Sequence, residues 1–153
     1  MQSRIFQAST KPIKREDYVC ADNYYDHWFT ITFADYVSDD CNRDEDIKWL
    51  KESVNGIKFG NDKNGDYLVI INKEDYFNEA FKRFKNHIDK LKDCTIQQFT
   101  SGIPCMYTLK NAYEEKFGFY IDVDEDLMTL DSFVREATEN KKYYIGNTID
   151  YHF

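Results

Sequence analysis

Long apolar runs are missing from this sequence of 153 residues. A membrane-spanning helix needs about 20 consecutive apolar residues, and no segment approaches that length. The N-terminal stretch MQSRIFQASTKPIKRED also lacks the apolar core of a secretory signal peptide. We therefore expect a cytoplasmic protein that does not associate with membranes, and its net charge of −8 also disfavours anionic lipid surfaces.

Closely spaced cysteine pairs are missing as well. The four cysteines lie 21, 53 and 11 residues apart, with no C-x-x-C pair and none of the spacings of a zinc site. In a reducing compartment such cysteines remain thiols. The sequence therefore predicts no metal and no cofactor, and free thiols at Cys20, Cys41, Cys94 and Cys105.

The common catalytic motifs are absent too. The sequence contains no glycine-rich phosphate loop, no H-E-x-x-H motif and no nucleophile elbow. No local pattern pairs a cysteine with His27, His87 or His152, as nucleophilic catalysis would require. These absences favour a non-enzymatic protein. The alternative is a small enzyme that uses a carboxylate or a cysteine in a cleft between a sheet and its helices.

Glycine and proline are scarce, with six and two residues, and no linker or repeat divides the chain. Apolar residues make up 42% and charged residues 31%, which is typical of a globular domain. Residues 1–153 are therefore predicted to form one domain. Aromatic residues are abundant, because 12 Phe and 12 Tyr stand against six Leu. We expect rings to fill most of the core, and a tyrosine-bearing recognition surface is the alternative.

The first apolar patterns predict a strand and then a helix. Residues His27–Phe33 alternate between apolar and other side chains, as a half-buried strand does. Asn42, with Glu45 three residues later, has the pattern of a helix N-terminus, and Gly56 is suited to ending that helix.

A hairpin and a long helix are predicted next. Asn64-Gly65 is typical of a tight hairpin turn, and it separates Ile57–Gly60 from the apolar run Tyr67–Ile71. Asn72 is a suitable cap for a helix that extends to about Lys92. That helix has one apolar stripe, made of Phe77, Phe81, Phe84, Ile88 and Leu91. We expect the stripe to share a core with Phe29, Ile31, Leu68 and Ile70.

The remaining patterns complete the predicted fold. They indicate a helix from Pro104 to Gly118, a strand over Phe119–Val123, a helix capped by Thr129, and a strand over Tyr143–Phe153. The fold class is therefore α+β, with a mainly antiparallel or mixed sheet of about five strands packed by about four helices. The oligomeric state does not follow from these patterns.

Two acidic clusters are the candidate functional feature. The residues predicted to bind are Asp39, Asp40, Asp44, Glu45 and Asp46 near one helix start, and Asp122, Asp124, Glu125 and Asp126 near another. The alternate carboxylates of the second cluster resemble half of a calcium loop, but Leu127 replaces its glycine and Phe133 its closing glutamate. Solvated helix starts are the alternative explanation.

The overall charge determines which partner we expect. An acidic chain does not bind nucleic acid directly, because basic residues supply most of that affinity. The sequence instead predicts a binding or inhibitory module whose acidic face contacts a basic protein surface, such as that of a nucleic-acid-binding protein.

Overall fold

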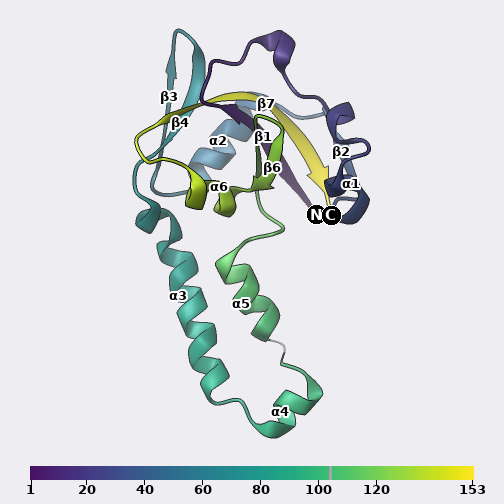
Figure 1. Ribbon diagram of the computed structural model, residues 1–153, viewed down its shortest axis with the longest axis vertical. Helices are drawn as coiled ribbons and strands as arrows, with labels where there is room; N and C mark the ends of the chain where they lie inside the picture. The colour runs from purple at the N-terminus through teal and green to yellow at the C-terminus, as the bar shows by residue number, and fades with distance from the viewer. Residues whose placement is uncertain (104) are drawn as a thin grey trace.

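The strands form one mixed sheet around the C-terminal strand. The computed structural model describes residues 1–103 and 105–153. Its seven strands are β1 (Gln2–Ser9), β2 (Tyr36–Ser38), β3 (Ile57–Asp62), β4 (Gly65–Ile70), β5 (Tyr120–Val123), β6 (Asp126–Thr129) and β7 (Lys142–His152). Their order is β3-β4-β7-β1-β5-β6, and β2 pairs with the end of β7 (Figure 1). Strands β1 and β5 are parallel, and the other pairs are antiparallel.

Helices cover both faces of this sheet. The α-helices are α1 (Trp28–Thr32), α2 (Arg43–Ser53), α3 (Lys73–Lys92), α4 (Ile96–Ser101), α5 (Cys105–Tyr113) and α6 (Leu130–Glu136). Helices α2 and α6 cover one face, where Leu50 and Phe133 belong to the same core as Phe6. Helix α1 and the 3₁₀ turn η2 (Ala21–Tyr24) cover the other face, where Tyr24 and Phe29 are buried. The predicted α+β class is thus confirmed, with seven strands and six described α-helices instead of about five and four.

An extra residue in β7 lets this strand contribute to both cores. Phe6 pairs with Thr148, whereas Ala8 pairs with Ile145, which is three residues earlier in β7. Such a bulge turns the side chains beyond it toward the other face. Ile145 therefore lies in the core with Phe6, and Ile149 lies in the core on the opposite face.

Aromatic rings fill the second core, as the composition suggested. The Phe29 ring lies 4.8 Å from that of Tyr120 and 5.0 Å from that of Tyr151, measured between centroids. Phe33 and Phe153 pack against the edge of the same group. Edge-to-face pairs of this kind contribute about 0.5–1.5 kcal/mol to stability beyond the contribution of burying the rings.

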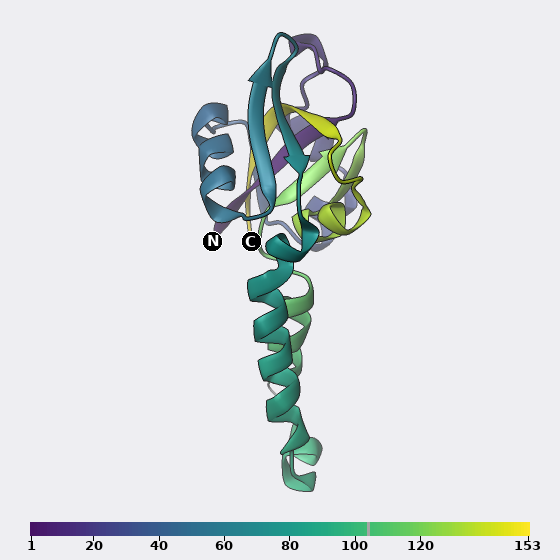
Figure 2. The same cartoon turned by 90° about the vertical axis from the view of Figure 1, so that its left-hand side faces the viewer.

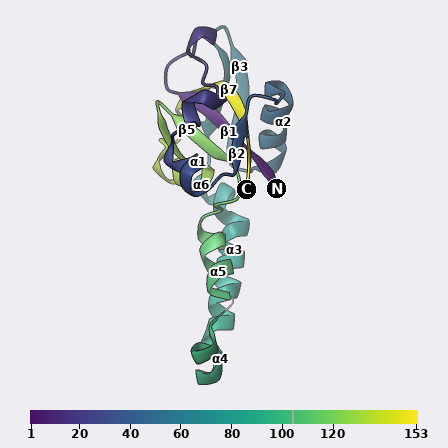
Figure 3. The same cartoon turned by 90° about the vertical axis from the view of Figure 1, so that its right-hand side faces the viewer.

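The chain between β4 and β5 projects away from the rest of the molecule. Helix α3 descends from the sheet, α4 lies at the far end, and α5 returns beside α3 (Figures 1, 2 and 3). Twenty helical residues span about 30 Å, so α3 reaches well beyond the sheet. We call residues 77–103 and 105–113 the arm, and the other described residues the body.

The apolar stripe of α3 does not face the core of the body, and this prediction was wrong. No residue of α3 is buried, and the side chain of Phe81 is 59% exposed. Beyond Phe81 the helix packs beside α5, where the rings of Phe84 and Tyr113 are 6.4 Å apart. Phe77, at the base of the helix, does pack against the core of the body. A helical period shows that one side of a helix is covered, but not what covers it.

The predicted strand over residues 27–33 was also wrong, because this segment forms α1. His27 caps the helix through Nδ1, which accepts from the backbone N–H of Phe29 at 3.3 Å. The hydroxyl of Thr30 donates to the carbonyl of Tyr24 at 2.5 Å, and so secures the turn. Phe29 and Ile31 would lie on the same side of an extended strand. In the helix they lie on different sides, so Phe29 is fully buried and Ile31 is 70% exposed.

The other elements agree with the predictions in part. Helix α2 begins after the predicted cap Asn42 but ends at Ser53, three residues before Gly56. The β3–β4 hairpin, α3, β5, β7 and the Thr129 cap of α6 were predicted, whereas β1, β2, β6 and α4 were not. The predicted helix start at Pro104 lies outside the described residues, and α5 ends at Tyr113 instead of Gly118. Across the described part of the chain, no helix is both long enough and apolar enough to cross a membrane.

Candidate functional site

A groove with acidic walls opens at the end of the body opposite the arm. The loop between β1 and η2 forms one side of it, and the tip of the β5–β6 hairpin forms another. This loop lies at the top of Figures 1, 2 and 3, and the arm at the bottom. The groove has a volume of about 640 Å³, and its lining carboxylates are those of Glu16, Asp17, Asp122, Asp124 and Glu125. No lysine or arginine lines it among the residues that the structure describes.

A buried tyrosine and aspartate form the inner wall of the groove. The hydroxyl of Tyr24 donates to Asp122 Oδ2 at 2.7 Å, and the two residues are 2% and 6% exposed. Burial, together with the adjacent Asp122 carboxylate, raises the pKa of Tyr24 well above its usual value. The hydroxyl therefore stays protonated and keeps η2 attached to β5. The pair supports the groove and does not present an ionised tyrosine to a substrate.

Two acidic residues form the turn at the rim of the groove. Val123 pairs with Asp126, which leaves Asp124 and Glu125 as a two-residue turn with φ values of 53° and 73°. A left-handed backbone costs a residue with a side chain about 1–2 kcal/mol, and Asn-Gly is the usual choice at such a turn. Asp124 and Glu125 are both exposed, so their carboxylates face solvent at the groove.

The opposite rim is attached to the sheet by two amide side chains. Gln7 Nε2 donates to the carbonyl of Asp17 at 2.8 Å, while Gln7 Oε1 accepts from the backbone N–H groups of Val19 and Asn147 at 3.1 Å each. The side chain of Asn147 in turn donates to the carbonyl of Val19 at 2.8 Å. These bonds join the loop to β1 and to the bulge in β7. A Cβ at Gly146 would overlap the Gln7 amide, so the arrangement requires glycine there.

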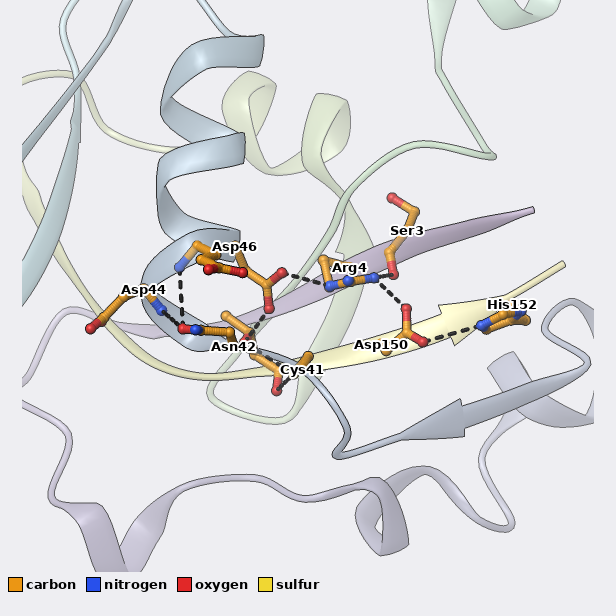
Figure 4. Close-up of polar contacts among 10 residues, drawn as sticks. Ser3, Arg4, Cys41, Asn42, Asp44, Asp46, Asp150 and His152 are labelled. Carbon is orange, nitrogen blue, oxygen red and sulfur yellow. Dashed lines mark hydrogen bonds and ion pairs between the residues drawn. The ribbon is translucent and has the colours of Figure 1, made fainter.

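A second cluster of polar side chains lies between α2 and the sheet (Figure 4). The Arg4 guanidinium contacts Asp46 Oδ1 at 2.7 Å and also pairs with the Asp150 carboxylate. The side chains of these three residues are 13% exposed or less. Asp46 Oδ2 accepts from the hydroxyl of Thr148 at 2.7 Å. One cation thus neutralises two buried carboxylates and attaches the first turn of α2 to β1 and β7.

This cluster contains a cysteine and a histidine but not a catalytic pair. The Cys41 thiol donates to the carbonyl of Thr148 at 3.1 Å, and His152 Nε2 lies 3.2 Å from Asp150 Oδ2. Burial is the main cause that raises the pKa of the Cys41 thiol, which disfavours the reactive thiolate. Among the described residues, neither His27 nor His152 hydrogen-bonds to a cysteine sulfur. The cysteine form of the enzyme alternative therefore gains no support from this geometry.

The nine acidic residues predicted from the sequence lie in different environments. Asp46 and Asp122 are buried and paired inside the body, at 4% and 6% exposure, so neither carboxylate is free to meet a partner. Asp122, Asp124 and Glu125 line the groove. The exposed residues outside it are Asp39, Asp40, Asp44, Glu45 and Asp126.

The turn η2 connects the two acidic clusters. At its start, the backbone N–H of Ala21 donates to Asp39 Oδ1 at 2.9 Å, and at its end Tyr24 donates to Asp122. Sequence reasoning missed Glu16 and Asp17, which belong to the groove although they lie far from both clusters in sequence. Their signal was weak, because two adjacent acids after Lys14-Arg15 do not stand out by charge alone.

Comparison of the chain with protein-family models, curated proteins and solved structures finds no match in any of the three.

Proposed function

We propose that the acidic groove binds a cationic segment of a partner protein in the cytoplasm. The observation that carries this proposal is the lining itself, in which four exposed carboxylates and the buried one of Asp122 occur without a lysine or arginine among the described lining residues. Concave surfaces lined by one sign of charge concentrate the field and attract ligands of the opposite sign. Pro12 and Ile13 supply apolar wall, against which the stems of Lys or Arg side chains can pack.

The partner that fits this chemistry presents a basic surface. Proteins that bind nucleic acid carry such surfaces, so this chain would act as an inhibitor by occupying one of them. If it does, DNA and this protein compete for the same partner. Binding of the partner to DNA should then fall as the protein is added, and should be restored by excess DNA.

The direct test measures binding of a fluorescent oligo-arginine peptide by anisotropy. The groove variant combines Glu16→Gln, Asp17→Asn, Asp124→Asn and Glu125→Gln, which keeps the shapes and removes four charges. We expect affinity to fall about tenfold or more, because exposed charge pairs contribute about 0.2–1 kcal/mol each and 1.4 kcal/mol is tenfold. The affinity of the wild type should also decrease as salt is added.

A matched control variant removes four charges from the first acidic cluster. It combines Asp39→Asn, Asp40→Asn, Asp44→Asn and Glu45→Gln, and it leaves the groove intact. We expect its affinity for the peptide to stay close to that of the wild type. Equal losses in the two variants would mean that net charge alone attracts the peptide, and would remove the groove as the site.

A further inference from the structure

The arm leaves several large apolar side chains exposed. Ile96 and Phe99 at its far end are each 68% exposed, and Phe81, Tyr107 and Met106 are 59%, 57% and 43% exposed. Exposed apolar side chains that lie together mark interaction surfaces in proteins, and Ile96 and Phe99 both belong to α4. The contact between α3 and α5 therefore leaves these five side chains largely uncovered.

One side of the arm is open near its base. The Arg135 guanidinium lies 4.5 Å from the ring centroid of Phe77 and 4.0 Å from that of Tyr113, so these two rings lie on the same side. Phe81 is one helical turn beyond Phe77. Together with Lys73, the two phenylalanines line a mainly apolar groove of about 560 Å³. A partner on this side of the arm would meet aromatic rings bordered by the cations of Lys73 and Arg135 and by the Glu74 carboxylate.

The charge of the arm is opposite to that of the body. The arm carries six Lys or Arg residues and three Asp or Glu residues, which is a net charge of +3. The whole chain has a net charge of −8, so the rest of the chain carries −11. Four arm cations form no ion pair within 4.0 Å among the described residues, and they are Arg83, Lys85, Lys90 and Lys110.

We propose that the arm docks on a second copy of this chain, with its cations and exposed rings against the acidic groove end of the body. This inference rests on the proposed function and identifies its cationic partner as the arm of another copy. The exposed tip residues Ile96 and Phe99 meet the apolar wall of the groove, and Lys90 lies near its carboxylates.

Charge and shape favour this arrangement over the symmetric one. Two arms packed together would bring like charges of +3 into contact, whereas an arm and a body attract each other. The loop between β1 and η2, which lines the groove, and the arm lie at opposite ends of the molecule in all three views (Figures 1, 2 and 3). One copy therefore cannot fill its own groove with its own arm. Docking is therefore head-to-tail, and it forms open chains or closed rings.

The first measurement is the weight-average mass of the full chain by analytical ultracentrifugation. We expect the mass to rise with concentration above the 18.3 kDa of one copy at about 10 mM ionic strength, where the Debye length is about 30 Å. In about 1 M salt, where that length is about 3 Å, the mass should return to one copy. A monomer at every concentration up to about 1 mM in low salt, or an assembly that salt does not weaken, would overturn the proposal.

Charge reversal at each end identifies the surfaces. The arm variant combines Lys85→Glu, Lys90→Glu and Lys110→Glu, and the groove variant combines Glu16→Lys, Asp17→Lys and Glu125→Lys. Each variant alone should be monomeric, because both of its ends then carry the same sign of charge. An equimolar mixture should associate again, since each reversed end now meets an end of opposite charge. A mixture that stays monomeric while the wild type associates would contradict arm-to-groove docking.

A matched control carries the same charge change as the arm variant on the body, through Lys51→Glu, Lys58→Glu and Lys63→Glu. All three residues are exposed. We expect this control to associate like the wild type. Circular dichroism of the arm variant should match that of the wild type, which shows that its helices remain folded.

The failure of this inference and that of the proposed function give different results. The arm variant keeps its acidic groove and should bind oligo-arginine as the wild type does. If the wild type is monomeric but binds the peptide, the self-association is wrong and the cationic partner is another protein. If the groove does not bind the peptide at all, the proposed function is wrong as well.

Discussion

The body and the arm of this protein use the same kinds of residue for different purposes. In the body, aromatic rings are enclosed in two cores, and buried carboxylates are paired with Arg4. In the arm, Phe81 and Phe99 are exposed, and no residue of α3 or α4 is buried. Burial drives folding in the body, whereas the arm retains apolar surface and unpaired cations. The difference indicates that folding stability resides mainly in the body, while the arm leaves apolar side chains and cations at its surface.

Truncating one ring in each region gives the largest expected contrast. Phe29→Ala removes a fully buried ring and should reduce the free energy of unfolding by about 3–5 kcal/mol. Phe81→Ala removes a ring that is 59% exposed and should cost less than about 1 kcal/mol. Urea denaturation of the two variants measures both values. Equal losses in the free energy of unfolding would show that the side chains of the arm contribute as much to stability as those of the body.

Removing one cation from each region tests the same difference in electrostatics. Arg4→Met leaves Asp46 and Asp150 buried without their counter-charge, which should cost about 3–5 kcal/mol. Lys82→Met removes an exposed pair with Glu79 on α3 and should change stability by less than about 1 kcal/mol. Thermal or urea unfolding of both variants provides the measurement. A small effect of Arg4→Met would mean that water reaches the two carboxylates.

Much of the body could be predicted from the sequence because its signals are local. The Asn42 cap, the Asn64-Gly65 hairpin and the Thr129 cap each act within a few residues, and all three are present in the structure. β1 was missed because its pairing with β5 and β7 joins segments more than 100 residues apart. The position of the arm was missed because the stripe of α3 fits α5 as well as it fits a sheet.

The candidate site was predictable only in part, for a similar reason. Asp124 and Glu125 belong to an acidic run that composition reveals, whereas Glu16 and Asp17 join them only through the fold. Asp46 shows the limit of charge counting. It belongs to the same run as Asp44 and Glu45, but its side chain points into the body and pairs with Arg4. Helical geometry separates neighbours in sequence into a buried and an exposed set.

Substitution of Gly146 in the body tests whether the groove depends on the sheet beneath it. A Cβ at position 146 would overlap the Gln7 amide, which holds Asp17 and Val19 in place. We expect Gly146→Ala to cost about 1–3 kcal/mol by overpacking and to weaken binding of the oligo-arginine peptide. Gln7→Ala removes the overlap, so the double variant should lose less than the sum of the two single variants. If the losses in free energy of unfolding were additive in this double-mutant cycle, the Gln7 side chain would not be the reason why position 146 needs glycine.

The smallest expected effect is a difference in thiol reactivity. Measuring it compares the two regions without substituting any residue. Cys94 lies at the end of α3 in the arm, whereas the Cys41 thiol donates to Thr148 under α2. The three cysteines whose side chains are described, Cys20, Cys41 and Cys94, are free, and in denaturant we expect a titration of four thiols. In the native protein, alkylation should modify Cys41 later than Cys20 and Cys94, because burial raises the pKa of the Cys41 thiol and the thiolate is the reactive species. The alkylation rate of Cys41 should therefore keep increasing at a pH where an ordinary thiol has already reached its maximum rate.

Mass spectrometry of peptides after timed alkylation measures the extent of modification at each cysteine. If Cys41 reacted as fast as the exposed Cys20, the first turn of α2 would open as readily as a surface loop. The body would then not be more stable than the arm at this position.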